Sequence, residues 1–117
     1  MGKLTTHVLD TAHGCPAAGV HITLKRIDGD TSKLLADTAT NADGRCAQPL
    51  LEGSNFQPGT YELSFAVADY FRAKGTQLDD PPFIGDSVVR FGIADPDAHY
   101  HVPLLVSPWG YTTYRGS

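Results

Sequence analysis

Residues 61–67 read Tyr-Glu-Leu-Ser-Phe-Ala-Val, a stretch that decides the fold because its large apolar residues occupy every second position. Successive side chains of a β-strand point to opposite faces, so this pattern predicts a half-buried strand. Val20–Lys25 shows the same clean alternation, Leu4–Asp10 alternates more weakly, and Ser87–Ile93 is a further predicted strand. Loops rich in Gly, Pro, Asn and Asp separate these segments, as in proteins built from many short strands. The sequence therefore predicts an all-β fold.

Residues 1–117 are expected to form a single domain with about eight short strands. Turn signals at regular spacing favour a β-sandwich, and a closed barrel is the alternative. Helical structure is expected in one place only, where Asp69 could cap a short helix that Gly75 ends. Pro81 and Pro82 follow this helix and prevent regular structure locally.

Composition excludes several classes of partner. The chain has 117 residues, 41% of them hydrophobic, a formal net charge of −4 and an isoelectric point near 5.6. This acidic balance argues against binding to nucleic acid or to an anionic membrane surface. No apolar run approaches the roughly 18 residues of a membrane span, and the N-terminus lacks a secretory signal pattern. Two cysteines, Cys15 and Cys46, suit a reduced, cytoplasmic setting, and the sequence does not decide whether they form a disulfide.

The last 18 residues, 100–117, read as two strands joined by a Ser-Pro-Trp-Gly turn. The chain then closes on Tyr114, Arg115, Gly116 and Ser117, which together supply an aromatic ring, a guanidinium and a carboxylate. Most domains end in a dispensable tail without such groups. We therefore interpret this end as a strand terminus that contributes to a functional site.

Four segments of the chain carry a family resemblance: residues 100–108 (Tyr-His-Val-Pro-Leu-Leu-Val-Ser-Pro), the terminal Tyr-Arg-Gly-Ser, residues 6–17 and residues 40–45. Together they resemble the signature of 5-hydroxyisourate hydrolases, the transthyretin-related enzymes of urate breakdown. The resemblance implies a transthyretin-like sandwich of two four-stranded sheets with one short helix. It also implies a homotetramer with its active sites between subunits, and an enzyme without a cofactor or metal.

The same resemblance implies which residues act. It assigns catalysis to His7, Arg45, His101 and Ser117, and substrate binding to His7, Arg45 and Tyr114. The residue types suit these roles, because imidazole exchanges protons near neutral pH and a planar guanidinium grips a carbonyl-rich anionic ring. The sequence does not decide which histidine is the general base.

The implied reaction is hydrolysis of 5-hydroxyisourate to 2-oxo-4-hydroxy-4-carboxy-5-ureidoimidazoline, with cleavage of a cyclic amide C–N bond. No serine lies in a Gly-x-Ser-x-Gly context, so direct attack by water is expected rather than a covalent intermediate.

Two alternatives stay open. His99 and His101 form a His-x-His pair that, with His7, could hold zinc, but no acidic or cysteine ligand lies at a companion spacing. The second alternative is a small-molecule carrier of the transthyretin type, because one fold can host both functions. The carrier has lysine where this chain has His7, lacks an equivalent of Arg45, and does not end in Tyr-Arg-Gly-Ser. The resemblance therefore favours the enzyme.

The remaining candidates receive structural roles or none. Tyr114 and Arg115 would take opposite faces if the strand continued to the end, so only one of them can face a given site. The resemblance implies that this residue is Tyr114, and Arg115 is then expected to be structural. His13 and His21 fall in a loop and at an outward strand position, and no role is assigned to them.

Overall fold

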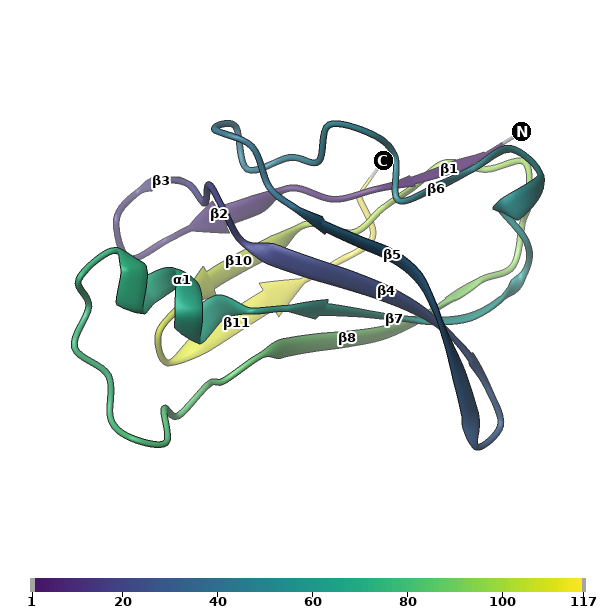
Figure 1. Ribbon diagram of the computed structural model, residues 1–117. Helices are drawn as coiled ribbons and strands as arrows, with labels where there is room; N and C mark the ends of the chain where they lie inside the picture. The colour runs from purple at the N-terminus through teal and green to yellow at the C-terminus, as the bar shows by residue number, and fades with distance from the viewer. Residues whose placement is uncertain (1, 117) are drawn as a thin grey trace.

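The structure, a computed structural model that describes residues 2–116, is a two-layered β-sandwich (Figure 1). One layer is an antiparallel sheet in the order β5-β4-β7-β8. Its strands are β4 (His21–Asp28), β5 (Thr31–Ala39), β7 (Gly59–Phe65) and β8 (Ser87–Ile93). The β4–β5 hairpin extends beyond the rest of the sandwich, at the lower right of Figure 1.

The second layer is divided into two sheets, in the orders β6-β1-β9 and β11-β10-β2-β3. Its strands are β1 (Lys3–Thr5), β2 (Val8–Asp10), β3 (Cys15–Pro16), β6 (Leu51–Glu52), β9 (Tyr100–His101), β10 (Leu104–Ser107) and β11 (Gly110–Thr113). β1 runs on into β2 and β9 into β10, so the division interrupts two longer strands rather than adding new ones.

The interruption leaves the register unchanged. Thr5 lies opposite His101 before it and Val8 opposite Leu104 after it, an offset of 96 positions in both cases. Pro103 lies within it and has no N–H to donate, which removes one bond from the ladder. The peptide N–H of Leu104 still donates to the His7 carbonyl oxygen at 2.9 Å. The two sheets therefore form one layer, and the β-sandwich that the sequence predicts is confirmed.

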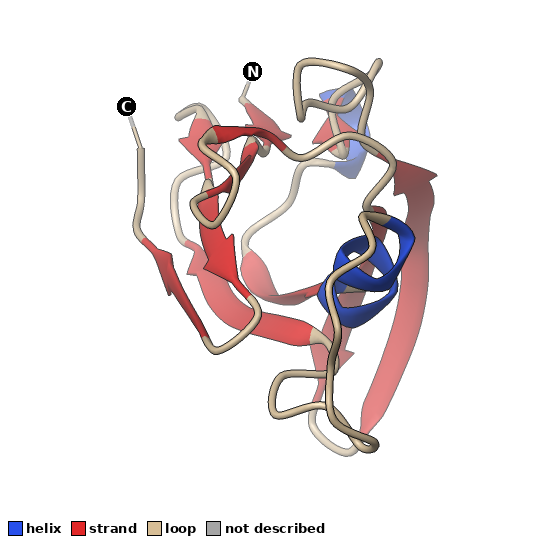
Figure 2. Cartoon of the chain, turned by 90° about the vertical axis from the view of Figure 1, so that its left-hand side faces the viewer, coloured by secondary structure: helices blue, strands red, loops and turns tan. Residues whose placement is uncertain are grey.

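The core lies between the layers and is formed by the alternating residues on which the prediction rested. Full burial of one large apolar side chain stabilises the fold by roughly 1.5–3 kcal/mol, so these positions dominate the packing energy. Figure 2 shows the molecule end-on, with strands on two sides and α1 across one end. The buried side chains include Leu4, Val8, Ile22, Leu24, Tyr61, Leu63, Phe65, Ile93, Leu104 and Val106.

Helical structure comprises α1 (Val67–Ala73) and a short 3-10 turn, η1 (Gly53–Asn55). The prediction that Asp69 caps α1 is wrong: the N-cap is Ala66, without a side-chain cap, and Asp69 lies inside the first turn. The helix begins three residues earlier because Val67, Ala68, Tyr70 and Phe71 are buried, and packing outweighs capping preference. Gly75, with φ of 88°, ends the helix as expected.

One buried carboxylate fastens α1 to the turn after β2. Asp10 accepts hydrogen bonds from the backbone N–H groups of Ala12 and His13, each at 2.9 Å. It also bonds the His13 ring at 2.7 Å and the Tyr70 hydroxyl at 2.7 Å. Burial alone would raise the pKa of Asp10, but the hydrogen bonds from Tyr70 and His13 outweigh it and lower the pKa.

Neither α1 nor η1 has the length and apolar character that a membrane-crossing helix requires, and the described residues 2–116 contain no other helix.

Candidate active site

His7 lies in the interruption between β1 and β2, where its backbone pairs with Arg45 in an isolated antiparallel bridge. Its side chain is half-buried on the face that the alternation of residues 4–10 predicted. The ring atom Nε2 donates to the backbone carbonyl oxygen of Asp43 at 2.9 Å. Because a carbonyl only accepts hydrogen bonds, Nε2 of His7 carries a proton.

Arg45 is delivered by the turn at residues 41–45. The Asn41 side chain accepts hydrogen bonds from the peptide N–H groups of Asp43 at 2.9 Å and Arg45 at 3.2 Å. Gly44 has φ of 75°, and a Cβ there would collide with the carbonyl oxygen of Val8. The turn conformation that presents Arg45 therefore requires glycine at position 44. Its guanidinium is exposed and makes no hydrogen bond or ion pair within residues 2–116.

His101, on β9, is held from both neighbouring segments. Its ring atom Nδ1 lies 2.9 Å from the Thr5 hydroxyl on β1. On the other side, the peptide N–H of Gly116 donates to the His101 carbonyl oxygen at 2.7 Å. A Cβ at Gly116 would lie 2.7 Å from the His101 ring, so this close approach requires glycine. The C-terminal segment therefore returns to lie against His101.

Arg45 and His101 line one open depression of about 540 Å³, together with Lys3, Thr5 and His99. A smaller depression of about 200 Å³ adjoins it and shares Lys3, Thr5 and Arg45. No acidic residue lines either one, although the chain as a whole carries a net charge of −4. The depression is therefore a locally cationic surface suited to an anion.

The same surroundings favour a neutral His101. Burial lowers the pKa of its imidazole, and the charges of Arg45 and His7 lower the pKa further. A hydrogen bond with the Thr5 backbone raises it in part. An imidazole with a depressed pKa stays unprotonated at neutral pH, which is the state that can accept a proton.

The structure brings together three of the predicted site residues, Arg45 and His101 in the depression and His7 beside them. Tyr114 is 57% exposed and lines a different, mostly apolar depression of about 240 Å³. Arg115 lines that second depression too, because β11 ends at Thr113 and strand alternation stops there. Its guanidinium lies 4.0 Å from the centre of the Tyr100 ring. Ser117 lies outside the described residues.

Sequence reasoning missed Lys3 and Thr5. Thr5 shared the predicted face of His7, and this was the available signal. Lys3 lies on the same face of the strand, two residues before Thr5. It was not predicted because a single exposed lysine is normally only a solvated residue. His99, which the sequence analysis considered only as a zinc ligand, is exposed and lines the depression.

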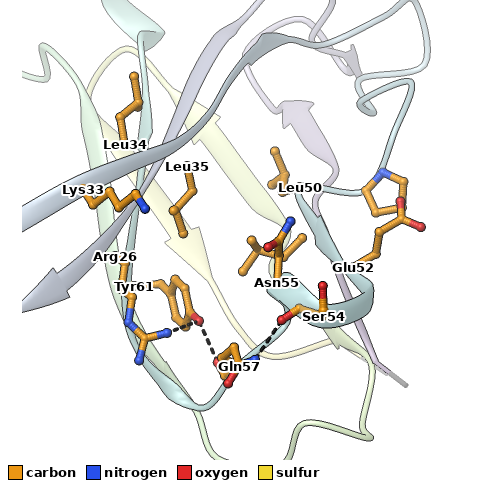
Figure 3. Close-up of a pocket in the computed structure, with 12 residues that line it drawn as sticks. Arg26, Lys33, Leu34, Leu35, Leu50, Glu52, Ser54, Asn55, Gln57 and Tyr61 are labelled. Carbon is orange, nitrogen blue, oxygen red and sulfur yellow. Dashed lines mark hydrogen bonds between the residues drawn. The ribbon is translucent and has the colours of Figure 1, made fainter.

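A larger depression, of about 640 Å³, lies elsewhere, between the β4–β5 hairpin and residues 49–57 (Figure 3). Some of its polar groups are engaged with one another. Arg26 donates to the Tyr61 hydroxyl at 3.0 Å, and that hydroxyl donates to the Gln57 carbonyl oxygen at 2.6 Å. Leu34 and Leu35 line the depression on the same side as Arg26 and Tyr61, as Figure 3 shows. This depression contains none of the predicted site residues and no histidine.

Within residues 2–116, no three His, Cys, Asp or Glu side chains lie close enough together to hold one metal ion. The His99–His101 pair therefore lacks the third ligand that the zinc alternative required.

Fold and site together define a transthyretin-like β-sandwich with a cationic, histidine-bearing depression. Residues 4–116 match the HIUase/Transthyretin family. The chain belongs to this family. It is 59% identical, over 117 residues, to the 5-hydroxyisourate hydrolase of Pseudomonas aeruginosa, covering 100% of this chain and 93% of the relative.

Two solved structures extend the likeness. The 5-hydroxyisourate hydrolase of Klebsiella pneumoniae superimposes with a TM-score of 0.82 at 33% identity, covering 100% of both chains. The crystal structure of (S)-allantoin synthase gives a TM-score of 0.94 at 49% identity over 99% of this chain. This chain spans only 44% of the length of that second protein.

Proposed function

We propose that this chain is a 5-hydroxyisourate hydrolase of urate degradation, which opens the substrate ring by cleaving a cyclic amide C–N bond. The observation that carries the proposal is the convergence of His101, Arg45 and Lys3 on one cationic depression beside His7. The 59% identity to a protein named 5-hydroxyisourate hydrolase supports the same substrate.

In the proposed reaction, His101 is the general base. Its lowered pKa keeps the ring neutral, whereas Nε2 of His7 is already engaged as a donor to a carbonyl. His101 removes a proton from water, the water oxygen bonds to a ring carbonyl carbon, and the C–N bond then breaks. The leaving nitrogen receives the proton from His101. Such general-base assistance contributes about 10²–10⁴ in rate.

Arg45 has the second proposed role. Its guanidinium has no partner within residues 2–116 and is free to bind the anionic ring and the oxyanion that develops on attack. Lys3 adds positive charge at the same depression. His7 contacts the substrate beside Arg45 in this proposal, as the family resemblance implies.

Direct attack by water is favoured over a cysteine nucleophile. Cys46 lines the adjoining smaller depression and is the nearest candidate. Burial raises the pKa of its thiol, which disfavours the thiolate that would be needed for attack.

We also propose a cytoplasmic homotetramer in which Tyr114 and Ser117 complete the site of a neighbouring subunit. The open depression and the exposed aromatic rings of Trp109, Tyr111 and Tyr114 support an interface near the C-terminal hairpin. The unpaired Cys15 and Cys46 suit a reducing compartment. Light scattering of the purified protein should give the mass of four chains, and a monomer at micromolar concentration would contradict this assembly.

An absorbance assay tests the function. A urate oxidase generates 5-hydroxyisourate in the cuvette, and the purified chain should accelerate its decay, with activity unchanged after exhaustive chelation. Activity lost on chelation and restored by zinc would refute the metal-free mechanism. Tight binding of the substrate without accelerated decay would instead favour the carrier.

A further inference from the structure

Thr5 contacts His101 but was not among the predicted site residues. β1 and β9 run parallel, and their register places Thr5 directly opposite His101. Both side chains line the depression and both are half-buried. The Thr5 hydroxyl lies 2.9 Å from Nδ1 of His101 and makes no other hydrogen bond within the described residues.

The two nitrogen atoms of an imidazole base are chemically linked. When Nε2 takes a proton from water, Nδ1 must already carry one, and the group beside Nδ1 must then accept a hydrogen bond. If the Thr5 hydroxyl instead donated to Nδ1, neutral His101 would hold its proton on Nε2 and could not act as a base there. A hydroxyl rotates freely between the two arrangements, so proton transfer at Nε2 selects the accepting one.

We infer that Thr5 is a positioning residue whose hydroxyl accepts a hydrogen bond from Nδ1 of His101 and leaves Nε2 free to accept the proton of the attacking water. This inference rests on the proposed function, because it takes His101 as the base. Thr5 itself touches neither the water nor the substrate in this arrangement.

A neutral partner suits the charges that face His101. Arg45 from the turn and His7 from the strand interruption lower its pKa, and Lys3 and His99 line the same depression. A carboxylate at position 5 would raise the pKa of His101. It would also form ion pairs with Arg45 and Lys3, which would then be less available to bind the substrate. Threonine supplies an acceptor for Nδ1 without adding negative charge.

Two variants distinguish the effect of the Thr5 hydroxyl on catalysis from the effect of the side chain's shape. Thr5→Val keeps the branched shape and suits a strand, whereas Thr5→Ser keeps the hydroxyl. Thr5→Val should lower kcat about 3- to 10-fold with KM unchanged, the kinetic equivalent of one neutral hydrogen bond. Thr5→Ser should stay within about twofold of the wild type. The acidic limb of the Thr5→Val pH profile should move to lower pH, because the imidazolium loses the hydroxyl as an acceptor and keeps only the Thr5 backbone.

Nitrogen NMR of the histidine rings gives a readout that does not depend on activity. Neutral wild-type His101 should show the tautomer with the proton on Nδ1, and Thr5→Val should lose this preference while Thr5→Ser retains it. A wild-type proton on Nε2, or a Thr5→Val protein with unchanged kcat and tautomer, would overturn the inference. If the wild type fails to hydrolyse 5-hydroxyisourate, the proposed function fails, and the tautomer still decides the role of Thr5. If Thr5→Val does not fold, the wild-type tautomer alone decides.

Discussion

His13 and His101 lie in two regions of the same layer and have opposite surroundings. The His13 ring bonds the buried carboxylate of Asp10 at 2.7 Å and stacks on Phe71, at the end of the sandwich that α1 covers. The His101 ring has the neutral Thr5 hydroxyl at 2.9 Å, and its pKa is lowered by burial first and then by the charges of Arg45 and His7. The first ring is part of a satisfied network, and the second faces an open, cationic depression.

The difference shows that the partner, rather than the imidazole, determines what a histidine does. The carboxylate partner of His13 fixes the local fold, because Asp10 joins the β2–β3 turn to Tyr70 of α1. A hydroxyl partner with nearby cations favours the neutral ring, which can exchange protons with a substrate. The predictions below test this contrast.

The largest effect is expected from paired histidine substitutions. His101→Asn should lower kcat for 5-hydroxyisourate by about 10²–10⁴, because asparagine cannot accept the proton. The matched control, His13→Asn, should leave kcat within about twofold and reduce only stability, through the lost bond to Asp10. The absorbance assay and a urea titration measure the two quantities. If a folded His13→Asn protein lost as much kcat as His101→Asn, the proposed difference between the two histidines would be wrong.

A second variant gives His101 the kind of partner that His13 has. Thr5→Asp should raise the pKa of His101 by about 1–3 units, because a carboxylate beside the ring favours the imidazolium. Since the base acts only when neutral, activity at pH 7 should fall and should recover as the pH is raised above the new pKa. Rate profiles against pH, compared with Thr5→Asn as an uncharged control, measure the shift. An acidic limb that does not move in Thr5→Asp would contradict the proposed electrostatics.

The smallest effect is expected in the other region. Tyr70→Phe removes one hydrogen bond to the buried Asp10 carboxylate and should lower the free energy of unfolding by about 1.5–3 kcal/mol, with kcat unchanged. The pKa of Asp10 is lowered in the folded state, so its contribution is present above pH ~4 and is lost as the pH falls through the lowered value. Urea titrations at a fixed protein concentration should therefore show the wild type and the variant converging in acid. If the free energies of unfolding of the wild type and Tyr70→Phe differed by the same amount from pH 7 to pH 2, the hydrogen bond between Tyr70 and the Asp10 carboxylate would not be the source of the difference.

The sequence alone determined the layers, the core and the face on which His7 lies. Alternation with period 2 follows from strand geometry itself, so Tyr61, Leu63 and Phe65 are all fully buried as their spacing predicted. The turn at residues 41–45 also has a local cause, because Gly44 adopts a positive φ that other residues rarely adopt. The family motifs added Arg45 and His101.

Only the tertiary structure decided which side chains meet. Thr5 and His101 lie 96 positions apart, and their contact depends on a parallel register that no local pattern encodes. Asp10 and Tyr70 meet in the same way, across 60 positions. The start of α1 was likewise set by the burial of Val67 and Tyr70 rather than by a capping residue. Local sequence specifies local backbone and burial, whereas the pKa of a histidine depends on charges and acceptors that long-range pairing brings to it.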